Sequence, residues 1–189
     1  MRKIVAGLFV SLDGVVEAPE QWHFSYFNDE MGETIASQMA GSDTMLLGRR
    51  TYEEFAAYWA DKGSDVPLAD EINQTPKLVA STTLDHVEWQ NSTLIRGGLA
   101  EELTRLKREP GKDISITGSA TLVRSLLRDD LLDELRLLVH PIVVGTGKRL
   151  FDGVLDQKPL KLVDSKVFTN GVLYLTYAPA TRFDTKETR

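Results

Sequence analysis

The stretch Thr44–Trp59 reads TMLLGRRTYEEFAAYW, and it joins a short apolar run to a helical pattern. The T-x-x-E capping box of Thr51 and Glu54 predicts that the helix begins near Thr51, so that Arg49 and Arg50 lie just before its N-terminus. A helix N-terminus already carries a partial positive charge, and two guanidiniums beside it are unfavourable unless an anion is bound. The stretch therefore predicts an anion site. The alternative is that an arginine simply pairs with a surface carboxylate.

Similar apolar runs recur along the chain. Short runs rich in branched side chains end in a small or polar residue at KIVAGLFV (3–10), KLVAS (77–81), TLIR (93–96) and DISITG (113–118). Leucine stripes with helical spacing follow the last two runs, over residues 99–106 and 122–127. This alternation predicts an α/β fold with a mostly parallel sheet, and the first run predicts a strand that is buried on both faces. Asn170-Gly171 predicts a hairpin with a type I′ turn, so the sheet should finish antiparallel.

Composition limits the possible partners and classes of site. The 189 residues suit a single domain over 1–180 with a frayed tail at 181–189. The net charge of −6, from 22 Lys plus Arg against 28 Asp plus Glu, argues against nucleic-acid and membrane partners. Cysteine is absent, the three histidines have no metal spacing, and no signal-peptide or membrane-spanning pattern is present. We therefore expect a cytoplasmic protein without a metal site.

Two further strand ends carry small or hydroxyl residues. The sequence GSATL (118–122) stands where a strand becomes a helix, and its small residues would let phosphates approach the backbone. Ser81, Thr82 and Thr83 follow another strand and could bind phosphate or ribose, although such a run is as often a turn. Ligands of open α/β sheets bind at the carboxyl ends of the strands, so these sites together suggest a dinucleotide with an extra phosphate. The G-x-G-x-x-G fingerprint of the Rossmann fold is missing after the first strand, which indicates another nucleotide-binding fold.

Four segments occur in the order of a known family after GLFVSLDG (7–14). They are LLGRRTYEEF (46–55), KLVASTT (77–83), ISITGSATLVRSLL (114–127) and DELRLLVHPIVVGTGKRLF (133–151). The chain resembles the dihydrofolate reductase superfamily over residues 3–178, and it is most similar to the reductase domain of bacterial riboflavin biosynthesis and its stand-alone relatives. The resemblance implies a three-layer α/β/α fold around a mixed sheet, with NADPH lying across the strand ends. That reductase is often fused to a zinc deaminase whose motif contains cysteine. This chain contains no cysteine, so it departs from the fused form.

The resemblance assigns the cofactor-binding residues. Ser81 and Thr82 match the segment that meets the adenosine 2′-phosphate. The motif G-R-x-T would hold the cofactor phosphates, and the glycine-rich turn would lie under the pyrophosphate and nicotinamide; these two segments comprise Gly48, Arg49, Arg50, Thr51, Gly118, Ser119, Ala120, Thr121 and Leu122. The arginines would then offset the phosphates of NADPH, whose 2′-phosphate a guanidinium can bind in bidentate fashion.

The catalytic and substrate residues are less well defined. Dihydrofolate reductases carry a carboxylate on the first helix, and of the acids in that region Asp29 is our candidate. Asp13 in SLDG matches the riboflavin-type signature; it could contact substrate or form an Asx turn before the glycine. The aromatic residues Trp22, Phe27 and Trp59 could line a substrate pocket, or they could be core or dimer contacts.

The function implied is an NADPH-dependent reductase. It would pass hydride from nicotinamide C4 to a C=N or C=O carbon of a small heterocycle, such as a pterin or aminopyrimidine, or of a carbonyl substrate. The alternative is a non-catalytic nucleotide- or flavin-binding protein that retains the fold. The resemblance also implies a homodimer, with the antiparallel C-terminal strands as contacts.

Overall fold

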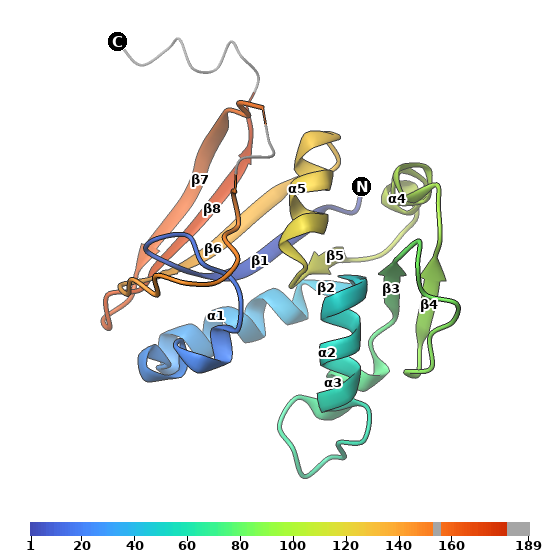
Figure 1. Cartoon of the computed structure of the whole chain (residues 1–189), viewed down its shortest axis with the longest axis horizontal. Coiled ribbons are helices and arrows are strands. Elements are labelled where there is room, and N and C mark those ends of the chain that lie inside the picture. The colour runs from blue at the N-terminus through green and yellow to red at the C-terminus, as the bar shows by residue number, and fades with distance from the viewer. Residues whose placement is uncertain (153–155, 181–189) are drawn as a thin grey trace.

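The computed structural model describes residues 1–152 and 156–180, and a mixed eight-stranded sheet forms their centre (Figure 1). The strand order is β4-β3-β2-β5-β1-β6-β8-β7. From β4 to β6 every neighbouring pair is parallel, whereas β8 pairs antiparallel with both β6 and β7. The strands are β1 (Ile4–Ser11), β2 (Ser42–Gly48), β3 (Lys77–Ala80), β4 (Ser92–Ile95), β5 (Asp113–Ile116), β6 (Glu134–His140), β7 (Leu160–Val167) and β8 (Leu173–Pro179).

Helices cover both faces of the sheet, which confirms the predicted three-layer α/β/α fold. The helices are α1 (Asp29–Ala40), α2 (Arg49–Trp59), α3 (Ala69–Gln74), α4 (Leu99–Arg108) and α5 (Ala120–Arg128), with short 3-10 turns η1 (Pro19–Gln21) and η2 (Phe24–Tyr26). Residues of α4 and α5 pack on one face, and residues of α1, α2 and α3 pack on the other. In the described residues, no helix is long and apolar enough to cross a bilayer.

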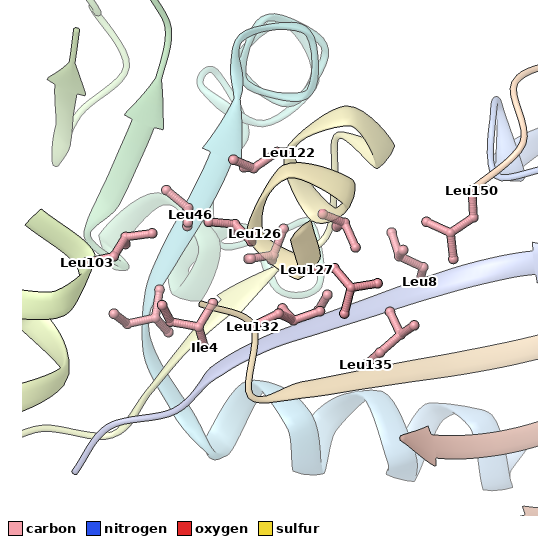
Figure 2. Packing of buried hydrophobic residues seen from close by; sticks show 14 of the residues in the cluster. Ile4, Leu8, Leu46, Leu103, Leu122, Leu126, Leu127, Leu132, Leu135 and Leu150 are labelled. Carbon is pink, nitrogen blue, oxygen red and sulfur yellow. The ribbon is translucent and has the colours of Figure 1, made fainter. Parts of the chain in front are cut away.

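The largest core cluster lies between the sheet and the helices α4 and α5 (Figure 2). Ile4 and Leu8 of β1 face Leu126 and Leu127 of α5, and Leu103 of α4 closes the cluster at the other side. The remaining positions of β1 face the opposite layer, so the strand is buried on both faces, as its continuous apolar run predicts. The leucine stripes of α4 and α5 are therefore core faces, and they fix the N-terminus of α5 against the sheet.

The C-terminal hairpin is confirmed, but its predicted type I′ turn is wrong. Of the two central residues, only Gly171 has a positive φ, +86°. The Phe168 amide donates to the Val172 carbonyl, and the Gly171 amide donates to the Phe168 carbonyl. The turn is thus centred on Thr169 and Asn170, and Gly171 follows it as a bulge residue. The Asn170 side chain also accepts a hydrogen bond from the Val172 amide, which favours this arrangement.

The predicted start of α2 is also wrong. The helix begins at Arg49 with Gly48 as its N-cap, and no side chain among the described residues caps it. The two arginines are therefore its first residues rather than the residues before it. Thr51 is buried against the turn at Gly118 instead of capping the helix. The reason is that the pairing of β2 with β3 continues in register through Gly48, so no residue is left between the strand and the helix.

Candidate functional site

Two strand-to-helix junctions lie against each other at the carboxyl edge of the parallel strands. The Gly48 amide donates to the Gly118 carbonyl at 3.3 Å, across the ends of β2 and β5. A Cβ added to Gly48 would lie 2.6 Å from the Ser119 Oγ, and one added to Gly118 would lie 2.6 Å from the Thr51 Oγ1. We call Gly48, Thr51, Gly118 and Ser119 the junction cluster. Its two glycines are required for close packing, and this packing brings the N-termini of α2 and α5 together.

Gly118→Ala should destabilise the protein by about 1–3 kcal/mol, because the new methyl group would overlap the buried Thr51 side chain. Thr51→Ala in the same chain removes the overlapping atoms and should restore most of the loss. Chemical denaturation of the two single variants and the double variant measures this coupling. Gly97→Ala is the control, because a Cβ there meets no atom of the described residues within 4 Å. If the two substitutions changed the free energy of unfolding additively, the result would contradict the proposed contact.

Arg49 and Arg50 extend from the first turn of α2 toward solvent, with side chains 52% and 58% exposed. Arg49 pairs with Glu53 at 3.4 Å, and Arg50 pairs with Glu54 at 3.6 Å. The surface-pairing alternative therefore describes the contacts of both arginines in this structure. Exposed ion pairs of this kind contribute roughly 0–1 kcal/mol, so they leave the guanidiniums available to a phosphate.

The other predicted cofactor residues divide into exposed and buried positions. Ser119 is the N-cap of α5, and its hydroxyl accepts from the Leu122 amide at 3.3 Å. Ala120 is half-buried and Thr121 is exposed in the first turn of the helix, whereas the Leu122 side chain is buried in the core of Figure 2. At Leu122 the backbone, and not the side chain, is therefore available to a ligand. The Gly118–Ser119 peptide bond is cis.

Ser81 and Thr82 leave the end of β3 beside this cluster. The Ser81 hydroxyl accepts from the amides of Thr83 and Leu84, both at 3.1 Å, so the turn interpretation applies to Ser81. Its hydroxyl hydrogen stays free to donate to Thr83 or to a ligand, because the acceptor role uses only its lone pairs. Thr82 is exposed. The turn and ligand-binding interpretations are thus compatible at this position.

Asp13 holds together two loops at the ends of β1 and β6. Its carboxylate accepts from the Ser11 hydroxyl at 2.7 Å and from the amides of Val144 and Gly145 at 3.0 and 2.9 Å. The hydrogen bond from Ser11, together with those from the two amides, lowers the pKa of Asp13 well below its ordinary value. Arg149 also donates to the Asp13 carbonyl oxygen. The carboxylate is therefore an ionised acceptor that positions the 144–149 loop, and it is poorly suited to donating a proton.

Asp29 lies exposed in the first turn of α1, and no hydrogen bond or ion pair to its side chain is found in the described ranges 1–152 and 156–180. The next acid, Glu30, accepts from the amide and hydroxyl of Thr169, both at 2.7 Å, and these bonds lower its pKa. Glu30 thus anchors the β7–β8 turn to α1. Of these two acids, Asp29 is the one that stays available to a ligand.

The aromatic residues of the segment after β1 pack into a cluster rather than forming the wall of an open substrate pocket. The cluster consists of Phe9, Trp22, His23, Tyr26 and His140, with His23 stacked on Phe9 at 4.4 Å between ring centroids. Trp22 is buried and its indole N–H donates to the Glu17 carbonyl at 3.2 Å, so it fits the alternative that it is a core residue.

The remaining predicted aromatic contacts lie in different surroundings. Phe27 is half exposed, beside Gly32 of α1. Trp59 ends α2 and packs with the Tyr52 and Trp89 core. It stands ten residues beyond Arg49, or about 15 Å along the helix axis at 1.5 Å per residue. The structure therefore places Trp59 away from the junction cluster.

The two histidines of the aromatic cluster predict acid sensitivity. Burial lowers the pKa of both His23 and His140 from the ordinary 6.5, and their mutual repulsion lowers that of His23 further, against a small opposing effect of Glu20. Between the folded and unfolded pKa values the unfolded chain binds more protons, so the free energy of unfolding should fall as the pH drops below about 6.5. His23→Phe should reduce this loss and change little at pH 8, since His23 Nδ1 makes no hydrogen bond to the part of the chain that the structure describes. Denaturation curves between pH 5 and pH 8 measure the difference. An unchanged pH dependence would contradict the assignment.

Glu17 was not identified from the sequence. Its carboxylate accepts from the Lys148 amide at 3.2 Å and reaches Arg50 at 4.0 Å. It thereby connects the segment after β1 with the 144–149 loop and the start of α2. No local pattern signals this role, because the contacts join residues more than 30 and more than 130 positions apart. In the described residues, no group of three or more His, Cys, Asp or Glu side chains is arranged to hold a metal ion.

Comparison with known proteins agrees with this architecture. The family model described as RibD C-terminal domain matches residues 2–174. The uncharacterized protein YyaP of Bacillus subtilis is 33% identical over 181 residues, covering 93% of this chain and 94% of its own. A putative riboflavin biosynthesis protein from Shewanella sp. PV-4 has a TM-score of 0.78 at 21% identity, covering 95% of this chain and 99% of its own.

A more distant solved structure extends the likeness. Dihydrofolate reductase from Enterococcus faecalis, complexed with NADP(H) and RAB-propyl, has a TM-score of 0.63 at 15% identity and covers 95% of this chain and 97% of its own. At these identities the solved structures establish the fold alone. The family-model match over nearly the whole chain establishes more: the chain belongs to the RibD C-terminal domain family, a reductase-type family with a dihydrofolate reductase-like fold.

Proposed function

We propose that this protein is an NADPH-dependent reductase whose substrate is a small heterocycle of the pterin or aminopyrimidine kind, or a carbonyl compound. The observation that carries the proposal is the junction cluster, which brings the N-termini of α2 and α5 together beneath two exposed arginines. Membership of the family supports reductase chemistry, and the Enterococcus neighbour is itself complexed with NADP(H). NADP(H) dependence and the substrate class are our proposals for this chain.

The residues present fit a phosphorylated dinucleotide. Within residues 1–152 and 156–180 no side chain caps the N-terminus of α2, so its amide hydrogens can donate to an anion. Glycine at positions 48 and 118 removes the side chains that would otherwise separate α2 from α5. Arg49 and Arg50 would bind phosphate oxygens with charge-assisted hydrogen bonds, which are stronger than those of neutral donors. Ser81 and Thr82 would contribute hydroxyl donors at the adenosine end.

The protein's contribution to the reaction would be positioning and exclusion of water. When bound, NADPH would supply hydride from nicotinamide C4, and the substrate would take hydride on carbon and a proton on nitrogen or oxygen. The N-terminus of α5, at Ala120 and Thr121, would orient the cofactor, and the loop held by Asp13 would border the nicotinamide end. Because Asp13 is held ionised, Asp29 is the more suitable of our two candidate acids for supplying the proton.

Binding and turnover of the wild-type protein test the proposal. Titration by cofactor fluorescence should give a much lower Kd for NADPH than for NADH, and NADPH should be oxidised with at least one member of a panel of pterins, aminopyrimidines and carbonyl compounds. Equal affinities for the two cofactors would contradict the cofactor assignment. Tight NADPH binding without oxidation across the panel would favour a non-catalytic nucleotide-binding protein instead.

We also propose that the protein forms a homodimer through β7 and β8. β7 is the edge strand, and its Leu162, Val163 and Val167 are 49%, 58% and 71% exposed. An exposed apolar edge strand favours association. Light scattering should give the dimer mass for the wild type, and Leu162→Lys with Val167→Lys should give the monomer. A wild-type protein that is monomeric at micromolar concentration would overturn this proposal.

A further inference from the structure

Arg124 lies on the outer face of α5 but is largely covered. The apolar stripe of α5 faces the core, and Thr121, Arg124 and Arg128 follow one another on the opposite face at helical spacing. A polar helix face of this kind predicts exposed side chains. The side chain of Arg128 is indeed 58% exposed, whereas that of Arg124 is 16% exposed. Another segment of the chain therefore covers Arg124.

The covering segment is the end of the 144–149 loop. The Nη1 group of Arg124 donates to the carbonyl oxygens of Arg149 and Leu150, both at 3.1 Å, and it lies 2.7 Å from the Asp152 carboxylate. The Leu150 side chain is buried and belongs to the core cluster of Figure 2, so this end of the loop is itself fixed. Two main-chain carbonyls and a carboxylate thus satisfy the covered guanidinium.

The same guanidinium also reaches the start of α5. Its Nη2 group donates to Thr121 Oγ1 at 3.2 Å, and Thr121 stands in the first turn of the helix. The hydroxyl hydrogen of Thr121 can still be donated elsewhere, because the bond from Arg124 uses a lone pair. A planar guanidinium suits such a double contact, since its N–H groups point in fixed directions. One side chain therefore connects the first turn of α5 with the end of the 144–149 loop.

The 144–149 loop is also held from the side of β1. Asp13 and Glu17 accept hydrogen bonds from amides of the loop, and the Leu150 amide donates to the Gly14 carbonyl at 2.9 Å. These contacts fix the loop to the segment after β1, whereas Arg124 fixes it to α5. The position of the loop relative to the first turn of α5 thus depends on the bonds of Arg124.

We infer that Arg124 is a positioning residue that couples the first turn of α5 to the 144–149 loop, and so sets the shape of the site where substrate would meet the nicotinamide. It acts through Thr121 and the loop carbonyls, and touches neither ligand itself. The inference rests on the proposed function, because it assumes that the cofactor lies at the start of α5 and the substrate beside the loop. A ligand that orders Thr121 should then also slow opening of the loop, since one guanidinium holds both.

Hydrogen exchange measures this coupling, because it reports the local opening of hydrogen-bonded amides. Without ligand, Arg124→Ala should speed exchange over the 144–149 loop roughly tenfold, because charge-assisted hydrogen bonds are lost, and should leave β3 and β4 unchanged. Arg124→Lys should give an intermediate increase, because lysine keeps the charge but lacks the fork that bonds both segments. Arg128→Ala, one turn along the same helix face, is the matched control and should exchange as the wild type does.

Addition of NADPH extends the test to the ligand. In the wild type NADPH should slow exchange over the 144–149 loop. Arg124→Ala should bind NADPH with a Kd within about threefold of the wild type, yet without slowing the loop. For a panel compound that the wild type reduces, Arg124→Ala should lower kcat about tenfold, because the loop no longer holds its position during reaction.

Three results would overturn the inference and leave the proposed function intact. The first is unchanged exchange over the 144–149 loop in Arg124→Ala. The second is an equal increase over every peptide of the protein, which would assign the arginine a general role in stability. The third is wild-type binding of NADPH that does not slow the loop. A wild-type protein that does not bind NADPH would overturn the proposed function and this inference with it.

Discussion

Replacing Arg49 and Arg50 together by alanine is expected to remove most of the preference for NADPH over NADH. Both guanidiniums lie at the start of α2, and their ion pairs with described residues are all to exposed glutamates. A hydrogen bond to a charged group contributes about 1.5–3 kcal/mol, so the loss of two should weaken NADPH binding roughly 100-fold or more. NADH binding should weaken less, because it lacks the 2′-phosphate. Fluorescence titration of both cofactors with the double variant measures the ratio.

The control for this variant is Arg108→Ala combined with Arg128→Ala. These two arginines are exposed near the ends of α4 and α5, so their removal changes the net charge equally without touching the junction cluster. A general electrostatic effect would appear in both double variants, whereas a specific phosphate site affects only the first. If the arginine-49/50 variant kept the wild-type cofactor ratio, the assignment of these residues would be wrong.

The largest loss of stability is expected from Lys77→Ala. The side chain is fully buried in β3, and its Nζ donates to the carbonyls of Ile72, Asn73 and Thr75 at 2.9, 3.0 and 2.7 Å. It also lies 4.3 Å from the centre of the Trp89 ring. Removal leaves a cavity and takes the amine donor from three carbonyls, although the Asn73 carbonyl keeps a hydrogen bond from the Asn91 side chain at 3.1 Å. The free energy of unfolding should therefore fall by about 3–5 kcal/mol. Urea denaturation measures this change.

Lys77→Met separates the hydrogen bonds from the cavity, because methionine fills similar space without a donor. It should recover part of the loss, whereas Lys62→Ala, at an exposed lysine near α3, should change stability little. Burial lowers the pKa of Lys77 to about 8 from the ordinary 10.5. Between these values the unfolded chain binds more protons, so wild-type stability relative to Lys77→Met should rise as the pH increases from about 8 to 10.5. A flat difference across that range would contradict the buried-amine assignment.

This lysine also matters for the candidate site. Asn73 accepts from the Trp89 indole at 2.6 Å, and the Tyr52 hydroxyl accepts from the amides of Glu88 and Trp89. The network therefore fixes the far end of the segment that begins with Ser81. We expect Lys77→Met to weaken NADPH binding modestly, through looser positioning of that segment rather than through a lost contact.

Sequence reasoning identified the parallel strands, the leucine faces of α4 and α5, and the two junctions at Gly48 and Gly118. These features depend on local patterns: continuous apolar runs, helical spacing, and glycine at a strand end. The two wrong predictions also came from local patterns. Thr51 and Glu54 fit a capping box, but the contact of Thr51 with Gly118 replaced the cap. Asn170-Gly171 fits a type I′ turn, but the Asn170 side chain bonds the Val172 amide and a different turn forms.

The sequence by itself determined the layers, the order of the candidate phosphate-binding segments and the family, because each of these depends on patterns of neighbouring residues. Only the tertiary structure decided which side chains share a site. The loop contacts of Asp13 and the link from Glu17 to Arg50 join segments far apart in the chain. The reason is physical: strand register and helix packing fix these distances to within a few ångströms, and no short-range pattern encodes them.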